Sequence, residues 1–270
     1  MRRVFLSASA IAILLGTSFS VRAQSEVTLV APGGIRAAVE QMAPGFEQKT
    51  GYKLKSTFLS GGGTKQEVVR GGAYDVAILQ PPYPEVLASG NVVETSATPF
   101  ASVAVGVAVK KGSPKPDIST PEAAKKMLLA AKSISSPDAS TGAAAGVSIN
   151  DMLKKMGVDE QIEPKLKRVK GKGPGGAGGG DIAMAMVADG EVEIGMTFLS
   201  EMNDPGIDRV GALPREISPR TALVGFVSTH AKNLEAAKAL LQYLSSPAAA
   251  AVYKAIGMES AAVENSNQHH

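Results

Sequence analysis

Short apolar runs alternate with amphipathic stretches along most of the chain, which is the pattern of βαβ units built around mostly parallel sheets. The first unit is the clearest. An apolar run over 27–31 predicts a buried strand, residues 32–34 predict a turn, and apolar residues at helical spacing predict a helix that ends at Gly51. The pattern therefore predicts an α/β fold.

The same pattern continues almost to the end of the chain. Further strands are predicted over 52–58, 75–79, 100–109, 133–136, 166–170, 192–198 and 221–228. Further helices are predicted over 64–70, 121–132, 143–156, 181–189 with Asp181 as N-cap, 233–244 and 247–256. The polar residues 259–270 show no period, and we expect them to be disordered.

Two of the predicted strands are long enough to pass between two halves of the molecule. The run over 100–109 follows a polar link, and the run over 221–228 can carry the chain back. We therefore expect two α/β lobes with mixed sheets flanked by helices, joined by two crossing hinge strands. Lobe I takes residues 24–101 plus 216–270, and lobe II takes residues 102–215.

The first 23 residues have the features of a signal peptide. Arg2 and Arg3 give a basic start, residues 4–19 form an apolar core too short to span a bilayer, and Val21-Arg22-Ala23 offers the small residues that a signal peptidase needs. A retained anchor is the alternative, but no Cys follows the core to carry a lipid. We expect cleavage near Gln24 and a periplasmic location.

Charge and composition exclude several classes of function. Without the three arginines of the signal segment, the chain carries 25 basic and 25 acidic residues, so its high isoelectric point gives no reason to expect nucleic-acid binding. The chain has no Cys, which excludes a thiol nucleophile, a thiolate metal site and disulfides. No metal motif appears, and no cofactor or metal is implied.

Four turns rich in glycine, serine or threonine each follow a predicted strand and lead into a helix. In an open α/β sheet such turns meet at the carboxyl edge, where N–H groups at helix N-termini bind anions. Each turn alone is ordinary turn chemistry, but four of them facing one cleft favour an anion site. The candidate ligand residues from these turns are Gly33, Gly34, Ser60, Gly61, Gly62, Ser140, Thr141 and Gly142, and the fourth turn spans 171–180.

Two longer side chains beside these turns are further candidates. Arg36 in the first turn of the first helix either reaches the cleft, to pair with a carboxylate or phosphate, or lies exposed on the surface. Gln80, just after the strand over 75–79, has the same two interpretations.

Catalytic patterns are nearly absent from the sequence. A histidine-assisted nucleophile has a single candidate base, His230, because His269 and His270 end the chain. Residues 171–176 match G-x-G-x-x-G, but Pro174 interrupts the match and we treat it as chance. We expect no enzyme, although an exported enzyme on the same scaffold stays the competing class, since acid–base pairs assembled by folding leave no motif.

Several segments resemble the periplasmic molybdate-binding proteins, which are class II extracellular solute-binding proteins of ABC importers. The resemblance covers nearly the whole chain after the signal segment. It rests on residues 27–31 before Ile35-Arg36-Ala37-Ala38, on Phe46-Glu47-Gln48-Lys49-Thr50-Gly51, on Tyr74-Asp75-Val76, on residues 107–113, and on Ser246-Pro247-Ala248 with Tyr253 and Gly257. It implies a type II periplasmic binding-protein fold, a monomer, a small anionic ligand between the lobes, and a membrane permease as partner.

The chain departs from this family at the positions where the resemblance places ligand contacts. Gly34 and Gly61 stand where the family carries serines, and Phe198 stands where it carries a tyrosine. The other two contact regions correspond to 140–143 and to Asp181 and Ile182. Losing these hydroxyl donors favours a larger anion, such as an organic carboxylate or a phosphate ester, over molybdate, and a molybdate- or tungstate-like oxyanion stays the alternative. Presentation of the ligand to a membrane sensor is an alternative to transport.

Overall fold

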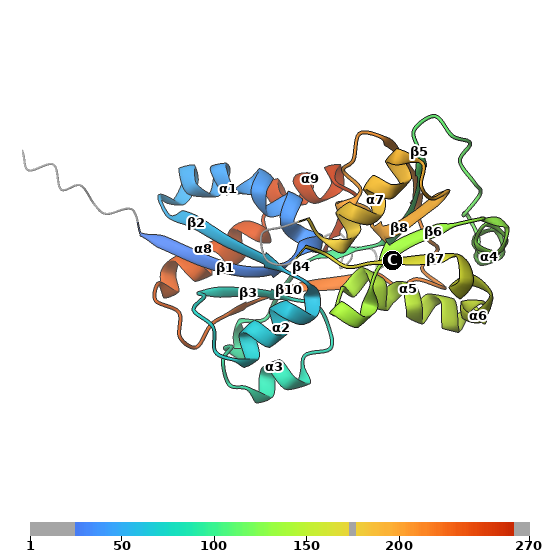
Figure 1. Cartoon of the computed structure of the whole chain (residues 1–270). Helices are drawn as coiled ribbons and strands as arrows, with labels where there is room; N and C mark the ends of the chain where they lie inside the picture. The colour runs from blue at the N-terminus through green and yellow to red at the C-terminus, as the bar shows by residue number, and fades with distance from the viewer. Residues whose placement is uncertain (1–24, 173–176, 262–270) are drawn as a thin grey trace, which may run out of the picture.

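Two β-sheets lie side by side in the molecule, and each carries helices on both faces (Figure 1). The computed structural model describes residues 25–172 and 177–261, so the predicted signal peptide over 1–23 lies outside the described residues. None of the helices in this described part is long and apolar enough to cross a membrane. The predicted α/β class with two helix-flanked sheets is confirmed.

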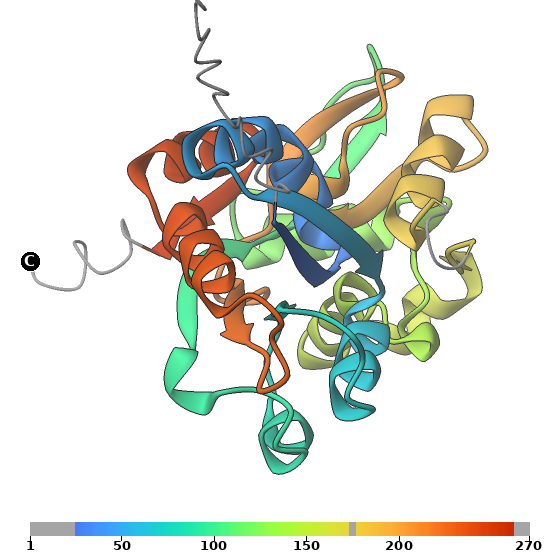
Figure 2. The same ribbon diagram turned by 90° about the vertical axis from the view of Figure 1, so that its left-hand side faces the viewer.

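The first sheet has six strands in the order β11-β4-β10-β3-β1-β2. β1 pairs in parallel with β2 and β3, whereas β10 runs antiparallel to β3 and β4. Helices α1, α8 and α9 pack together on one face, and α2 and α3 lie on the other (Figures 1 and 2). The strands are β1 (Glu26–Pro32), β2 (Lys53–Leu59), β3 (Val76–Leu79), β4 (Thr98–Val103), β10 (Thr221–Val227) and β11 (Met258–Ser260). The helices are α1 (Arg36–Thr50), α2 (Gly61–Val69), α3 (Pro84–Ala88), α8 (Leu234–Leu244) and α9 (Pro247–Ala255).

The second sheet has five strands in the order β7-β6-β8-β5-β9. β6 pairs in parallel with β7 and β8, and β5 runs antiparallel to β8 and β9. The strands are β5 (Val105–Lys110), β6 (Ile134–Pro137), β7 (Leu166–Val169), β8 (Ile194–Phe198) and β9 (Ile207–Ala212). The helices are α4 (Pro121–Ala130), α5 (Ala144–Lys155), α6 (Asp159–Ile162) and α7 (Gly179–Asp189).

Burial on both faces explains why the central strands are apolar without interruption. In β1, Leu29 belongs to the core under α1 and α8, and its neighbour Val30 belongs to a second core under α2 and α3. In the second sheet, Val107 of β5 belongs to the large core, and its neighbour Ala108 belongs to the core under α7. Successive side chains of a strand point to opposite faces, so each strand contributes to two cores.

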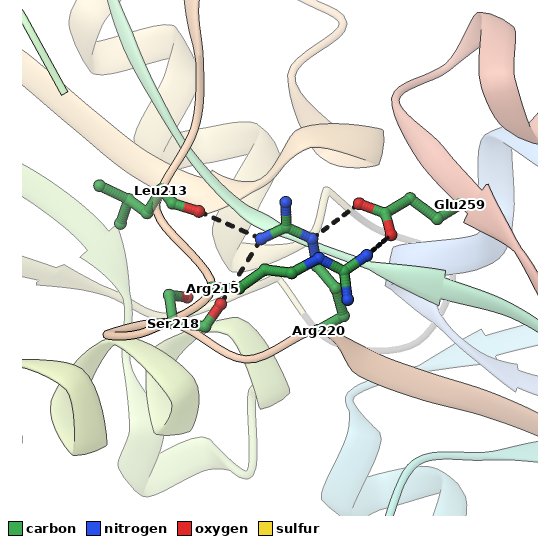
Figure 3. Close-up of polar contacts among 5 residues, drawn as sticks. All are labelled: Leu213, Arg215, Ser218, Arg220 and Glu259. Carbon is green, nitrogen blue, oxygen red and sulfur yellow. Dashed lines mark hydrogen bonds and ion pairs between the residues drawn. The ribbon is translucent and has the colours of Figure 1, made fainter. Parts of the chain in front are cut away.

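The chain passes between the two sheets twice. The predicted long strand over 100–109 divides at Ala104, with β4 in the first sheet and β5 in the second. The return runs from β9 to β10 through residues 213–220, where Arg220 donates to the Leu213 carbonyl at 3.1 Å and to Glu259 Oε1 at 2.8 Å (Figure 3). Arg215 also pairs with the Glu259 carboxylate. The return is therefore tied to the last strand.

Several predicted boundaries are wrong. Glu259 and Ser260 were expected to be disordered, but they pair with β4 in β11, because Glu259 neutralises two arginines of the return segment. Residues 61–63 were expected to be a turn, but they form the first turn of α2, since the Ser60 hydroxyl accepts from the Gly63 N–H at 3.0 Å. Asp181 is not the N-cap of α7, because its carboxylate accepts from the Gly178 N–H from the third helical position.

Asp75 connects three elements of the first sheet. Its carboxylate accepts from the Thr28 N–H and hydroxyl at 2.8 and 2.7 Å, and from the N–H groups of Lys232 and Asn233 at 2.7 and 3.2 Å. Burial alone raises the pKa of Asp75, but these hydrogen bonds together hold it below its ordinary value. The charged form of Asp75 therefore stabilises the start of β3 against β1 and α8.

Replacing this carboxylate tests the connection. We expect Asp75→Ala to lower the free energy of unfolding by about 3 kcal/mol at neutral pH, because buried N–H donors lose their acceptor. Since the native pKa is lowered, the difference from wild type is present above the ordinary pKa of 3.8 and shrinks as pH falls through the native value. Urea denaturation measures both effects. Asp151→Ala, at an exposed position of α5, is the matched control, and an equal loss in both variants contradicts the assignment.

Candidate functional site

A cavity of about 560 Å³ lies between the two sheets, at the carboxyl ends of β1, β2, β3, β6 and β8. Its wall contains the residues at or just before the first turns of α1, α2, α5 and α7. The first N–H groups of a helix have no partner within the helix and carry partial positive charge. The geometry therefore directs helix N-termini from both sheets toward one cavity of the size that small molecules occupy.

Most of the predicted site residues line this cavity. They are Gly33, Gly34, Arg36, Ser60, Gly61, Gln80, Thr141, Asp181 and Phe198. Gly62, Ser140, Gly142 and Ile182 do not belong to its wall.

Two of the residues outside the wall, Gly62 and Gly142, contact each other. The Gly62 N–H donates to the Gly142 carbonyl at 2.9 Å, and a Cβ added to Gly62 would lie 3.0 Å from the Gly142 Cα. The Ser60 hydroxyl donates to the Thr141 carbonyl at 3.2 Å beside them. These contacts join α2 to the turn before α5.

Gln80 is a buried polar residue of the cavity wall whose side-chain amide has no hydrogen-bond partner among the described residues. Its side chain is 3% exposed, and neither its Nε2 nor its Oε1 has a hydrogen-bond partner among the described residues. Its Oε1 lies against Gly61, where an added Cβ would be 2.7 Å away. A buried amide without partners costs roughly 1–3 kcal/mol, so it marks a place where a ligand can supply the missing hydrogen bonds.

The Arg36 side chain lines the cavity. Its guanidinium lies 5.2 Å from the centroid of the Phe58 ring, and both residues line the cavity. No carboxylate of the described residues lies within ion-pair distance of it. A planar fork of N–H donors held on an aromatic face can bind a carboxylate or phosphate through two bonds.

Phe198 and Gly34 fit each other inside the wall. Phe198 is 1% exposed, and a Cβ added to Gly34 would lie 3.3 Å from its Cδ2 atom. The Ser200 hydroxyl donates to the Gly34 carbonyl at 2.6 Å, so the second sheet also holds the start of α1. The ring occupies the space into which a larger residue at position 34 would extend.

Glu201 also lines the cavity, and the sequence analysis missed it. The Thr197 hydroxyl donates to its Oε2, and a Cβ added to Gly33 or Gly34 would lie 3.7 or 3.9 Å from its Oε1. Burial raises the pKa of Glu201 to about 7, and the negative charge of Asp181 adds to this effect. The Thr197 hydroxyl and the Arg36 charge act in the opposite direction.

A positional signal for Glu201 exists in the sequence. It stands three residues after the buried strand over 194–198, at the sheet edge where ligands bind, although acidic side chains most often belong to solvated helix faces. The one candidate base that the sequence offered, His230, lies outside the cavity wall and contacts Asn91 instead. In the described part of the chain, no group of three or more possible metal ligands gathers.

A family model described as "Bacterial extracellular solute-binding protein" matches residues 27–259. The chain belongs to this family. The extracellular solute-binding protein described here is 32% identical over 258 residues to an aconitate isomerase from a Pseudomonas species, covering 92% of this chain and 94% of that protein. It is 28% identical over 261 residues to the molybdate-binding protein ModA of Azotobacter vinelandii, covering 93% and 97%.

The fold of this solute-binding protein is shared with solved structures. The periplasmic molybdate-binding protein of Azotobacter vinelandii superposes with a TM-score of 0.69 at 18% identity, covering 86% of this chain and 98% of that one. The expected relation to the two-lobed, molybdate-binding-protein-like family is thus confirmed.

The raised pKa of Glu201 predicts that the stability of this solute-binding protein depends on pH. Between its ordinary value of 4.5 and about 7, the folded state holds a proton that the unfolded state has released, so stability falls as pH rises across this window. Glu201→Gln removes the titration. We expect the wild type to lose stability relative to this variant between about pH 5 and 7 and the difference to level off above, as measured by urea denaturation. A difference that is constant over the window contradicts the raised pKa.

Proposed function

We propose that this chain is a periplasmic solute-binding protein that holds a small organic carboxylate in the cleft and delivers it to the permease of an ABC importer. Membership of the extracellular solute-binding family supports the binding role. The convergence of helix N-termini, Arg36 and Gln80 on one cavity supports an anionic ligand. The proposed protein is a monomer, exported by its N-terminal signal, and uses no cofactor.

Three features favour an organic carboxylate over a bare tetrahedral oxyanion. The cavity of about 560 Å³ leaves space around a compact oxyanion, which needs donors on all sides to replace its hydration shell. Gly34, Gly61 and Phe198 supply no hydroxyl to such an ion. Arg36 offers the paired donors that match a carboxylate.

The unpartnered amide of Gln80 carries this proposal. If no polar ligand binds beside position 80, a buried amide there does not stabilise the protein. Leucine fills a similar volume without the cost of desolvating an amide. A ligand with both acceptor and donor atoms, such as a hydroxylated or partly protonated polycarboxylate, satisfies both atoms of the amide.

Closure of two lobes accounts for how binding is signalled. The proposed lobes take residues 24–101 plus 216–270 and residues 102–215, and each supplies helix N-termini to the ligand. A ligand that touches both lobes stabilises the closed arrangement, because its contacts with one lobe alone are fewer. The Gly62–Gly142 hydrogen bond forms part of this closed arrangement. The permease then binds the surface that the two lobes form together.

A thermal-shift screen tests the ligand class. We expect di- and tricarboxylates to raise the unfolding temperature, and molybdate, tungstate, sulfate and phosphate to leave it nearly unchanged. Arg36→Ala is expected to abolish the carboxylate effect, because it removes the counter-charge in the wall. Arg70→Ala, at the C-cap of α2 and outside the cavity wall, is the matched control and keeps the full shift. A shift with molybdate only, or an unchanged shift in Arg36→Ala, contradicts the proposal.

Gln80→Leu separates binding from folding. We expect roughly tenfold weaker carboxylate binding by calorimetry, because the ligand loses hydrogen bonds to the amide. The unfolding free energy without ligand is expected to stay equal or to rise, since a buried polar group without partners is removed. Lower stability together with unchanged affinity would show that the amide serves the fold and not the ligand.

A second candidate function is an exported isomerase that acts on an unsaturated tricarboxylate. The 32% identity to an aconitate isomerase over 92% of the chain favours it, and so does the carboxyl group of Glu201 in the cavity wall. Both candidates place a carboxylate in the same cavity. They differ in whether the bound compound is recovered unchanged or converted.

A further inference from the structure

When it is charged, the Glu201 carboxyl does not favour the binding of an anion. Its charged form repels a negative ligand in the same cavity, and the Asp181 carboxylate and Glu40 already add negative charge at the wall. Burial of an acid that weakens binding is costly unless the group does something else. The position of Glu201 inside the cavity therefore requires a second explanation.

Local packing holds this carboxyl in one place. The hydroxyl of Thr197, a fully buried residue of β8, donates to Oε2, and Gly180 at the start of α7 lies beside the same atom. A Cβ added to Gly180 would lie 2.7 Å from the Thr197 hydroxyl, so only glycine leaves space for this pair. Oε1 is directed toward Gly33 and Gly34 at the start of α1. An oriented acid among helix N-termini has the arrangement of a catalytic base with its orienting partner.

We infer that Glu201 is a catalytic base that moves a proton between two carbon atoms of an unsaturated polycarboxylate bound in this cavity. The inference rests on the proposed carboxylate ligand and deepens the second candidate function. It assigns to Glu201 the proton transfer, and to Thr197 the positioning of the carboxyl group.

The step balances without an oxidant or a cofactor. The Glu201 carboxylate removes a proton from a methylene carbon that lies between a carboxylate and a carbon–carbon double bond, so one C–H bond breaks and one O–H bond forms. The electron pair delocalises over the allylic system and the substrate carboxylate. Glu201 then returns the proton to the far carbon, the double bond moves by one position, and the base is regenerated. Rotation in the delocalised intermediate allows cis and trans products.

The surrounding charges suit both halves of this step. Arg36 and the N–H groups at the helix starts stabilise the charge that develops on the substrate carboxylate. A base is most effective when its pKa lies near the working pH, and burial raises the pKa of Glu201 to about 7. The charged groups that face it are Arg36 of α1, which lowers this value, and Asp181 of α7, which raises it.

The experiment follows cis- and trans-aconitate by proton NMR with purified wild type, Glu201→Gln and a protein-free blank, and it measures binding of trans-aconitate separately by calorimetry. We expect the wild type to interconvert the two isomers. Glu201→Gln is expected to bind trans-aconitate within about threefold of the wild-type affinity and to convert it roughly 100-fold or more slowly. Because both proteins are purified identically, the variant also controls for a contaminating isomerase.

Thr197→Val tests the positioning role with a residue of similar shape. We expect its conversion rate to fall and the pH at which the rate is half-maximal to rise, because the lost hydroxyl no longer stabilises the charged carboxylate. If Glu201→Gln does not fold, the lower conversion rate of Thr197→Val and the rise in its half-maximal pH test the inference instead.

The outcomes separate the inference from the proposed function. Binding of trans-aconitate by the wild type without interconversion, or equal conversion by Glu201→Gln, overturns the role of Glu201 and leaves the carboxylate-binding proposal intact. Absence of binding by every carboxylate in the screen overturns the proposed function and this inference with it.

Discussion

Helix N-termini cannot satisfy their own first N–H groups, and this constraint organises the molecule. Four helices that flank the two sheets begin at one cavity, so the partial positive charges of their first turns add there. Some of these groups are satisfied internally: Gly63 donates to the Ser60 hydroxyl, and Gly62 donates to Gly142 across the cleft. The helix starts are brought to this place by the parallel pairing of β1 with β2 and β3, and of β6 with β8.

The departures from the molybdate-binding pattern belong together. Gly34 follows β1 of the first sheet and Phe198 ends β8 of the second, and a Cβ on Gly34 would already lie 3.3 Å from the Phe198 ring. A serine at position 34 therefore requires the ring to move, whereas glycine accepts it without strain. Gly34 and Phe198 keep the wall closely packed and present no hydroxyl group to the cavity.

The sequence predicted the fold better than it predicted the site. Alternation of apolar and polar runs located the central strands, because burial on both faces leaves a signal in every strand. Glycine and serine turns located the helix starts, but not which turns face the ligand: Gly62 and Gly142 meet each other, a contact between segments 80 residues apart that local patterns do not encode. The role of Glu201 was missed for the same reason, since its burial arises only when β8, α1 and α7 pack around it.

Binding and proton transfer are closely connected in this cavity. A bound carboxylate adds negative charge beside Glu201, and a negative neighbour raises the pKa of an acid. By linkage, ligand binding and proton uptake then favour each other, so a carboxylate is held more tightly by the protonated form of Glu201. The same effect makes the Glu201 carboxylate a stronger base once substrate is bound, provided that it enters deprotonated. A pKa near 7 leaves both forms of Glu201 populated at neutral pH, so this one side chain is sufficient to serve either a carrier or an isomerase on this scaffold.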